Sequence, residues 1–190
     1  MKIYQRKTQG ESGITIRIEA TLKNVKQENL VLMNKDITYR QKFERPPKEI
    51  KVIEQTSKNS DVIYMEMDLP FPLTNRDFVQ KRLFVNNKED PELTRQLGLW
   101  NWDHKYNAIM IQSTEREEYP EKSKPIRGET KMIYLLLEED PRDATVVKYK
   151  MILDQDMKGD IPKLVKETLG EKMPKRMMTD ILKTHKKLFN

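Results

Sequence analysis

The chain has 190 residues, 36% hydrophobic and 35% charged, with a formal net charge of +6 and no cysteine. The lack of cysteine excludes disulfides, thiolate catalysis and cysteine-based zinc sites. The longest apolar run, residues 132–137, is far shorter than the ~18 residues that a membrane-spanning helix needs. No apolar segment follows the charged residues near Met1, so we expect no signal peptide and a single domain over residues 1–190.

The first part of the chain predicts strands. Residues 3–6 favour a short strand, and residues 13–22 alternate between apolar and polar side chains. Such alternation is typical of a strand with one buried face. The apolar face of the longer strand carries Ile14, Ile16, Ile18 and Ala20.

Two short helices are expected next. Asn24 is a suitable N-cap for a helix over residues 25–33. A second helix is predicted over residues 36–43, and Pro46 and Pro47 would end it.

A hairpin follows these helices. Residues 50–55 predict one strand, residues 58–61 a turn and residues 62–68 a second strand. Alternation places three apolar side chains of the second strand on one face, namely Ile63, Met65 and Met67.

Residues 69–79, which read LPFPLTNRDFV, join two strands through a stiff loop. The two prolines favour extended backbone and exclude helix there. The strand that follows covers residues 78–85. Arg76 and Asp77 are neighbours at its start, so we expect them on opposite faces in structural roles.

The second half of the chain predicts a polar insertion at residues 86–105, strands at 108–112, 126–138 and 145–154, and a charged loop at 114–125. A helix is expected from Ile161-Pro162 to the C-terminus, with apolar residues at helical spacing. Pro174 lies within it and predicts a kink or break. One long helix against an antiparallel sheet would leave a space suited to a ligand.

Several segments together carry a family resemblance. They are residues 36–43 (DITYRQKF), 61–64 (DVIY), 70–79 (PFPLTNRDFV), 112–114 with 120–121, 125–127, and 156–162. In this order they resemble START domains, the lipid-transfer domains related to the steroidogenic acute regulatory protein. The helix that usually precedes the first strand in that family is missing here.

The resemblance implies an α+β helix-grip fold, in which a curved antiparallel β-sheet wraps around a long C-terminal helix and encloses a lipid cavity. It implies no catalysis, no cofactor and no metal. It also implies a lid made by the last helix and residues 114–125. The residues expected at the lid or a membrane are Tyr119, Leu164, Thr168 and Lys172.

The resemblance suggests how a phospholipid head group would be bound. Arg40 and Glu44 match an arginine and an acid near the lipid phosphate, although a surface ion pair is the alternative. The positions that cage choline in phosphatidylcholine-binding members are Met65, Phe78 and Lys131 here. A quaternary ammonium needs several aromatic faces, so choline selectivity is not expected. Lys131 would favour an anionic group, or else would point outward.

Other inner residues follow from strand parity. Arg82 shares a face with Phe78, so it would contact lipid oxygens or form a structural salt bridge. Ile63, Met65 and Met67 would form the apolar wall against the acyl tails.

The function expected is that the chain binds one lipid, a phospholipid rather than a sterol or ceramide, and transfers it between membranes. Alternatives are a small-ligand protein or a cyclase-like or hydrolase-like enzyme on the same scaffold. Residues 158–187 hold nine Lys or Arg and four Asp or Glu, which suits transient contact with an anionic membrane. Nucleic-acid binding by this helix is a weaker hypothesis. We expect a cytoplasmic monomer, peripheral to membranes.

Overall fold

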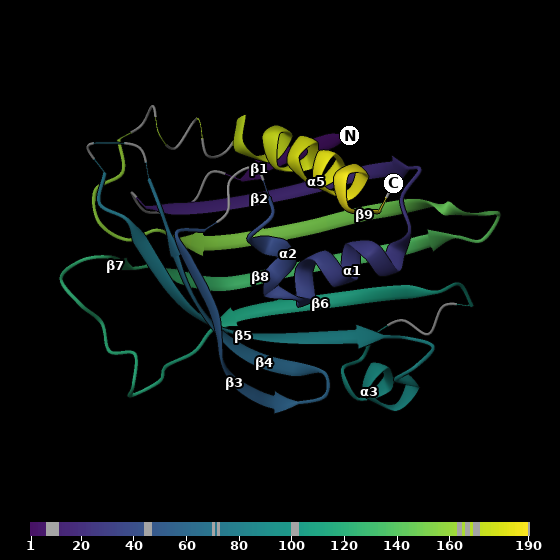
Figure 1. Cartoon of the computed structure of the whole chain (residues 1–190), viewed down its shortest axis with the longest axis horizontal. Coiled ribbons are helices and arrows are strands. Elements are labelled where there is room, and N and C mark those ends of the chain that lie inside the picture. The colour runs from purple at the N-terminus through teal and green to yellow at the C-terminus, as the bar shows by residue number, and fades with distance from the viewer. Residues whose placement is uncertain are drawn as a thin grey trace.

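The computed structural model describes the whole chain except for residues 7–11, 44–46, 70, 72, 100–102, 163, 164, 166, 167, 169–171 and 190. Within the described part, nine strands form one sheet (Figure 1). They are β1 (Lys2–Arg6), β2 (Gly13–Lys23), β3 (Glu49–Ser57), β4 (Ser60–Met67), β5 (Arg76–Asn86), β6 (Tyr106–Ser113), β7 (Ile126–Arg127), β8 (Glu129–Asp140) and β9 (Asp143–Asp156).

The strand order is β1-β2-β9-β8-β6-β5-β4-β3, and all these neighbours are antiparallel. The two-residue β7 pairs with β5 in parallel. Sequence neighbours therefore pair across most of the sheet, and the pairing of β2 with β9 joins the two ends of the chain. This pairing explains why the last helix can return to the sheet near the first strands.

The described helices are α1 (Gln27–Lys35), α2 (Ile37–Arg40), α3 (Pro91–Gln96) and α5 (Met173–Phe189). Figure 1 shows α1, α2 and α5 over the same face of the sheet. We call this the inner face and the opposite one the outer face. The fold class predicted from the sequence, a helix-grip fold, is confirmed by this arrangement.

Strand alternation builds the inner face. Ile16 and Ile18 on β2 are buried to 1% and 0% exposure, in the same apolar cluster as Met151 on β9. Met178 and Ile181 of α5 belong to this cluster as well. Burial of apolar side chains of this size stabilises the folded state by about 1.5–3 kcal/mol each, so α5 is held mainly by its apolar side.

The two helices that lie above the inner face also contact each other. The side chain of Asn29 on α1 lies 3.2 Å from Nε2 of His185 on α5. The ring of Phe189 stacks on that of Tyr39 in α2, with centroids 5.7 Å apart. These contacts join the N-terminal helices to the end of the chain.

The structure changes some predicted helix boundaries. The backbone of Asn24 has a φ of 59°, and α1 begins after Lys26 without a side-chain cap. The prediction that Asn24 caps the helix is therefore wrong; asparagine tolerates the left-handed conformation, and here it turns the chain out of β2. The second helix, α2, does have a side-chain cap: the carboxylate of Asp36 accepts a hydrogen bond from the Thr38 amide.

Residues around the C-terminal helix are described only in part. Pro174 is the second residue of α5 as described. Residues 163, 164, 166, 167 and 169–171 lie outside the described part. The predicted kink at Pro174 therefore stays a prediction.

Arg76 ties the end of the β4–β5 connection at Thr74 to the segment before the last helix. Arg76 is 1% exposed and donates hydrogen bonds to the carbonyls of Thr74, Met157 and Lys158. Asp77 points to the outer face, where its carboxylate binds Arg127 at 2.9 and 3.0 Å. The two neighbours therefore make separate structural contacts, on opposite faces.

Gly128 is required by close packing against Phe78. A Cβ at this position would meet Cζ of the Phe78 ring at 2.6 Å, and that ring is 0% exposed. We expect Gly128→Ala to lower the free energy of unfolding by about 1–3 kcal/mol, measured by urea denaturation.

The matched control is Gly98→Asn. Gly98 has a φ of 62° and nothing within 4 Å of an added Cβ, and asparagine tolerates this conformation. An equal loss of stability in the two variants would contradict the packing argument.

Candidate functional site on the inner face

The inner face presents an apolar wall from β4 and β5. Ile63 and Met65 are 3% and 7% exposed, and Phe78 is fully buried opposite Met65 in the strand register. Met67 is partly buried against the same cluster. The four residues share one face, as strand parity predicts, and their contact with lipid tails stays a prediction.

Arg82 lies on the same face and is paired inside the protein. Its guanidinium forms two hydrogen bonds of 2.7 Å with the carboxylate of Asp61, and both side chains are almost fully buried. It also donates to the carbonyls of Asn34 and Lys35, at 2.8 and 3.0 Å. These are the last residues of α1, whose carbonyls lack partners within the helix.

Most of the N–H groups of Arg82 are therefore used by protein atoms. The structure favours the alternative left open from the sequence, a structural salt bridge, over direct binding of lipid oxygens. Sequence parity placed Arg82 correctly, while its partner Asp61 was not identified from the sequence.

Arg40, at the end of α2, is the inner-face cation that differs most from Arg82. Within the described residues its guanidinium makes no hydrogen bond or ion pair; its contact is with the ring of Phe43, at 5.7 Å. Burial lowers the pKa of Arg40, and the positive charge of Arg82 lowers it further. The side chain nevertheless keeps intermediate accessible surface.

These properties of Arg40 belong together. The guanidinium is desolvated by the protein around it, while part of the residue remains accessible. Such a cation is costly without an anionic partner. The predicted partner Glu44 lies outside the described residues.

Lys131 occupies a β-bulge. The pairing of β8 with β9 shifts between Thr130 and Met132, so Lys131 is the extra residue, and its side chain is exposed. The structure thus favours the outward alternative for Lys131 over the inward position that the family resemblance implied.

The same bulge turns Thr130 toward the inner face, which the sequence pattern did not reveal. Thr130 Oγ1 accepts hydrogen bonds from the side-chain amides of Gln80, at 2.6 Å, and Gln155, at 2.8 Å. Gln80 shares the parity of Phe78 and Arg82, so parity alone could have identified it. The inward-facing residues of β8 after the bulge have odd numbers, so regular alternation would place Thr130 on the outer face. The extra residue of the bulge reverses this, and Thr130 faces inward.

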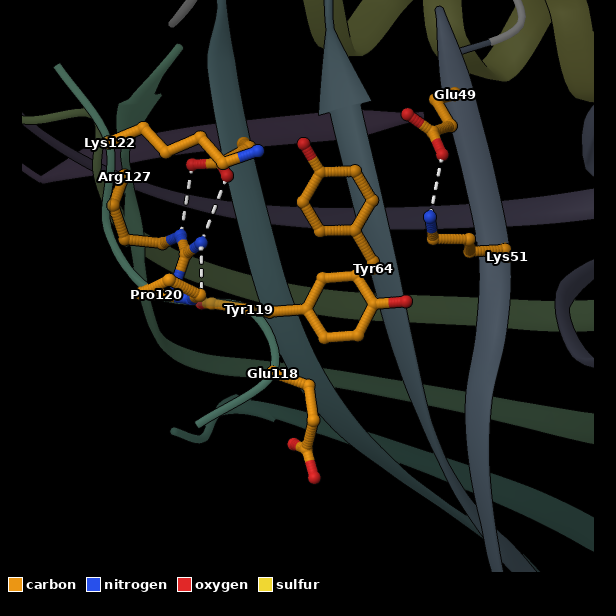
Figure 2. Close-up of a pocket in the computed structure, with 9 residues that line it drawn as sticks. Glu49, Lys51, Tyr64, Glu118, Tyr119, Pro120, Lys122 and Arg127 are labelled. Carbon is orange, nitrogen blue, oxygen red and sulfur yellow. Dashed lines mark hydrogen bonds and ion pairs between the residues drawn. The ribbon is translucent and has the colours of Figure 1, made fainter. Parts of the chain in front are cut away.

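The expected lid residue Tyr119 lies on the outer face. Its ring packs on Tyr64 with centroids 5.3 Å apart, and the Lys51 ammonium lies 5.1 Å from it (Figure 2). Arg127 donates to the Tyr119 carbonyl, and Arg116 pairs with Glu54 of β3. This placement differs from the lid expected at residues 114–125, because the Arg127 hydrogen bond and the Arg116–Glu54 ion pair hold that loop to the outer face.

A small pocket of about 140 Å³ opens beside Tyr119 (Figure 2). Most of the residues that line it are charged, and several of these charges are already paired: Arg127 with Asp77, and Lys51 with Glu49. Burial raises the pKa of Tyr64 to about 12, so its hydroxyl stays neutral at ordinary pH. The pocket is therefore poorly suited to acyl chains.

The other expected lid positions are on the C-terminal segment. Thr168 and Lys172 are exposed, and Leu164 lies outside the described residues. Over the described ranges, no three His, Asp or Glu side chains gather as metal ligands. In those same ranges, no helix is both long enough and apolar enough to cross a bilayer.

Comparison with known proteins adds to this geometry. Residues 10–186 match the model of a family described as "Protein of unknown function (DUF3074)". The chain is similar to the phosphatidylcholine transfer protein of Bos taurus, with 28% identity over 130 residues, covering 68% of this chain and 54% of the relative. The Mus musculus protein of that name is 30% identical over 112 residues, covering 59% and 46%. The chain thus spans about half the length of these curated relatives.

Solved structures show the same fold. Human STARD10 superposes with a TM-score of 0.75 at 21% identity, covering 98% of this chain and 74% of that one. Human StAR-related lipid transfer protein 5 superposes with a TM-score of 0.76 at 15% identity, covering 99% and 88%. The resemblance to START domains predicted from the sequence is confirmed.

The ion pair of the inner face can be tested by mutation. Asp61→Asn should lower the free energy of unfolding by about 3–5 kcal/mol, because the buried Arg82 charge would lose its carboxylate. Urea denaturation measures the change. Glu92→Gln, which removes an exposed partner of Arg95, should leave stability unchanged within error. Equal stability of Asp61→Asn and wild type would show that the pair is not needed.

The buried histidine predicts a pH dependence. Burial lowers the pKa of His185 below its usual 6.5, so its contribution to stability is complete above that value and is lost as pH falls toward the folded-state pKa. We expect unfolding free energy to drop between about pH 7.5 and about pH 5.5, a range in which most carboxylates remain ionised. The drop should shrink in His185→Gln and persist in the exposed variant Lys186→Gln. An unchanged drop in His185→Gln would contradict this assignment.

Proposed function

The chain belongs to the family described as "Protein of unknown function (DUF3074)", and we propose that it binds one phospholipid between the inner face and the helices and transfers it between membranes. The observation that best supports this proposal is Arg40, a desolvated cation without an ion-pair partner in the described part of the chain. The fold is that of START domains, and the relatives named above are phosphatidylcholine transfer proteins. The role proposed is binding and transfer rather than catalysis.

The phosphate of the lipid would serve as the anionic partner of Arg40. Charge-assisted hydrogen bonds between guanidinium and phosphate are short and strong in a desolvated setting. Arg82 adds positive potential nearby, although its own N–H groups are used by Asp61 and α1. A phosphate group fits this site better than a neutral sterol, which offers one hydroxyl and no charge.

The acyl chains would lie along the apolar wall. Ile63, Met65, Met67 and Phe78 belong to one apolar cluster, and Ile111 and Ile133 are partly buried against it. Burying acyl chains at about 0.8 kcal/mol per CH₂ would offset their removal from a bilayer. Methionine side chains adapt to different chain shapes.

Access and membrane contact would involve the last helix. The exposed side of α5 carries Lys175, Arg176, Lys183, Lys186 and Lys187, and cations near an anionic membrane each contribute about 1 kcal/mol. In the loop at residues 68–75, the Phe71 side chain is 97% exposed. We place the lid at α5 instead of residues 114–125, with the exposed Phe71 as a further membrane contact. The chain would act as a monomer, peripheral to cytoplasmic membranes.

The proposal is tested by native mass spectrometry of the purified protein and by transfer of labelled phospholipid between liposomes. We expect one bound phospholipid per chain and measurable transfer. Arg40→Gln should reduce transfer about 10- to 100-fold, the loss expected for charged hydrogen bonds. The matched control Arg17→Gln, at a side chain that is 59% exposed on β2, should transfer normally. The proposal fails if no lipid is bound and no phospholipid, sterol or ceramide is transferred.

A further inference from the structure

The inner face holds a cluster of three polar residues to which the proposed function gives no role. It consists of Gln80 on β5, Thr130 on β8 and Gln155 on β9, which we call the amide cluster. Gln80 is 2% exposed and Thr130 is 0% exposed, while Gln155 is partly buried. The three residues come from strands that β6 and β8 bring together.

The hydrogen bonds within the amide cluster leave some of its donors and acceptors without a partner in the described part of the chain. Thr130 Oγ1 accepts from both glutamine amides, so its own proton remains to be donated. The side-chain oxygens of Gln80 and Gln155 have no hydrogen-bond partner in the described part of the chain. Each glutamine amide also keeps a second N–H, so the cluster offers three donors and two acceptors.

The Gln80 oxygen borders accessible space. Among the described residues, the side-chain atoms that are sealed from water and lack a partner are Ser60 Oγ and Glu138 Oε2. The unpaired Gln80 oxygen is not one of them, so it keeps some accessible surface although its residue is nine-tenths buried. Buried polar atoms in native proteins nearly always have partners, which points to a ligand or water at this position.

The amide cluster lies on the same inner face as the apolar wall and Arg82. Inner-facing residues of β5 follow each other at about 7 Å, twice the strand rise per residue, and Gln80 stands between Phe78 and Arg82. The cluster is therefore part of the wall of the space proposed for the lipid, where polar groups of the cargo can meet it.

The chemistry of the cluster separates head-group classes. A quaternary ammonium cannot donate hydrogen bonds and needs several aromatic faces, of which Phe78 is the one that matches here. A primary ammonium donates hydrogen bonds and accepts none, so it would leave the N–H and O–H donors of the cluster unpaired. A hydroxyl group both donates and accepts, so several hydroxyl groups on one head group can pair with the amide oxygens and with the donors of the cluster.

We propose that the amide cluster recognises the hydroxyl groups of a polyol head group, so that the preferred cargo is a phospholipid carrying glycerol or inositol on its phosphate. This inference rests on the proposed function and specifies its cargo. Choline lipids would still enter through their phosphate and tails, with lower selectivity.

The test is a transfer assay from mixed vesicles that contain labelled phosphatidylcholine, phosphatidylethanolamine, phosphatidylserine, phosphatidylglycerol and phosphatidylinositol. We expect the glycerol or inositol lipid to be transferred about tenfold faster than phosphatidylcholine, the ratio that one to two net hydrogen bonds provide. Thr130→Val, which keeps the side-chain shape, should remove this preference and leave phosphatidylcholine transfer nearly unchanged. The matched control is Thr21→Val, at an exposed position on β2.

The outcomes separate this inference from the proposed function. Transfer of all five lipids without preference, or a preference for choline, ethanolamine or serine, overturns the inference alone. A polyol preference that survives in folded Thr130→Val also overturns it, whereas absence of any transfer overturns both proposals. If Thr130→Val does not fold, native mass spectrometry of the lipid bound by the wild-type protein decides between the outcomes. We expect a lipid with a polyol head group, and a bound choline lipid would contradict the inference.

Discussion

The buried ion pair between Arg82 and Asp61 is the interaction on which the inner face depends. It joins β4 to β5, and the remaining N–H groups of Arg82 bind the carbonyls at the end of α1. One guanidinium thus satisfies both a buried carboxylate and a helix end that would otherwise lack partners. Because α1 also contacts α5 through Asn29 and His185, the ion pair helps to position both helices above the sheet.

Neutralising Arg82 within the protein gives the other inner-face arginine a different role. Arg40 has no comparable carboxylate in the described part of the chain, and Arg82 repels its charge. A phosphate would relieve both effects. The apolar wall along Ile63 and Met65 is suited to tails, and the amide cluster to what the phosphate carries, so one face separates three kinds of chemistry.

Periodicity predicted much of the fold and part of the site. Alternation along β4 and β5 placed Met65, Phe78 and Arg82 on a common face, because side-chain direction in a regular strand depends only on sequence separation. Alternation does not continue through the bulge at Lys131, which adds one residue and turns Thr130 to the inner face. A helix cap was also misplaced at Asn24, since capping and left-handed residues are of the same types.

The sequence by itself determined the order of most strands and of helices α1, α2 and α5, the START-like motifs and the choice of inward side chains along regular strands, because these depend on local spacing; it did not predict α3 or the division between β7 and β8. Only the tertiary structure decided which charges are neutralised and where the loops lie. Arg82 meets Asp61 21 residues away, Gln80 meets Thr130 50 residues away, and Tyr119 packs on Tyr64 across the outer face. Such pairs form when strand register brings distant segments together, and no local pattern in the chain specifies them.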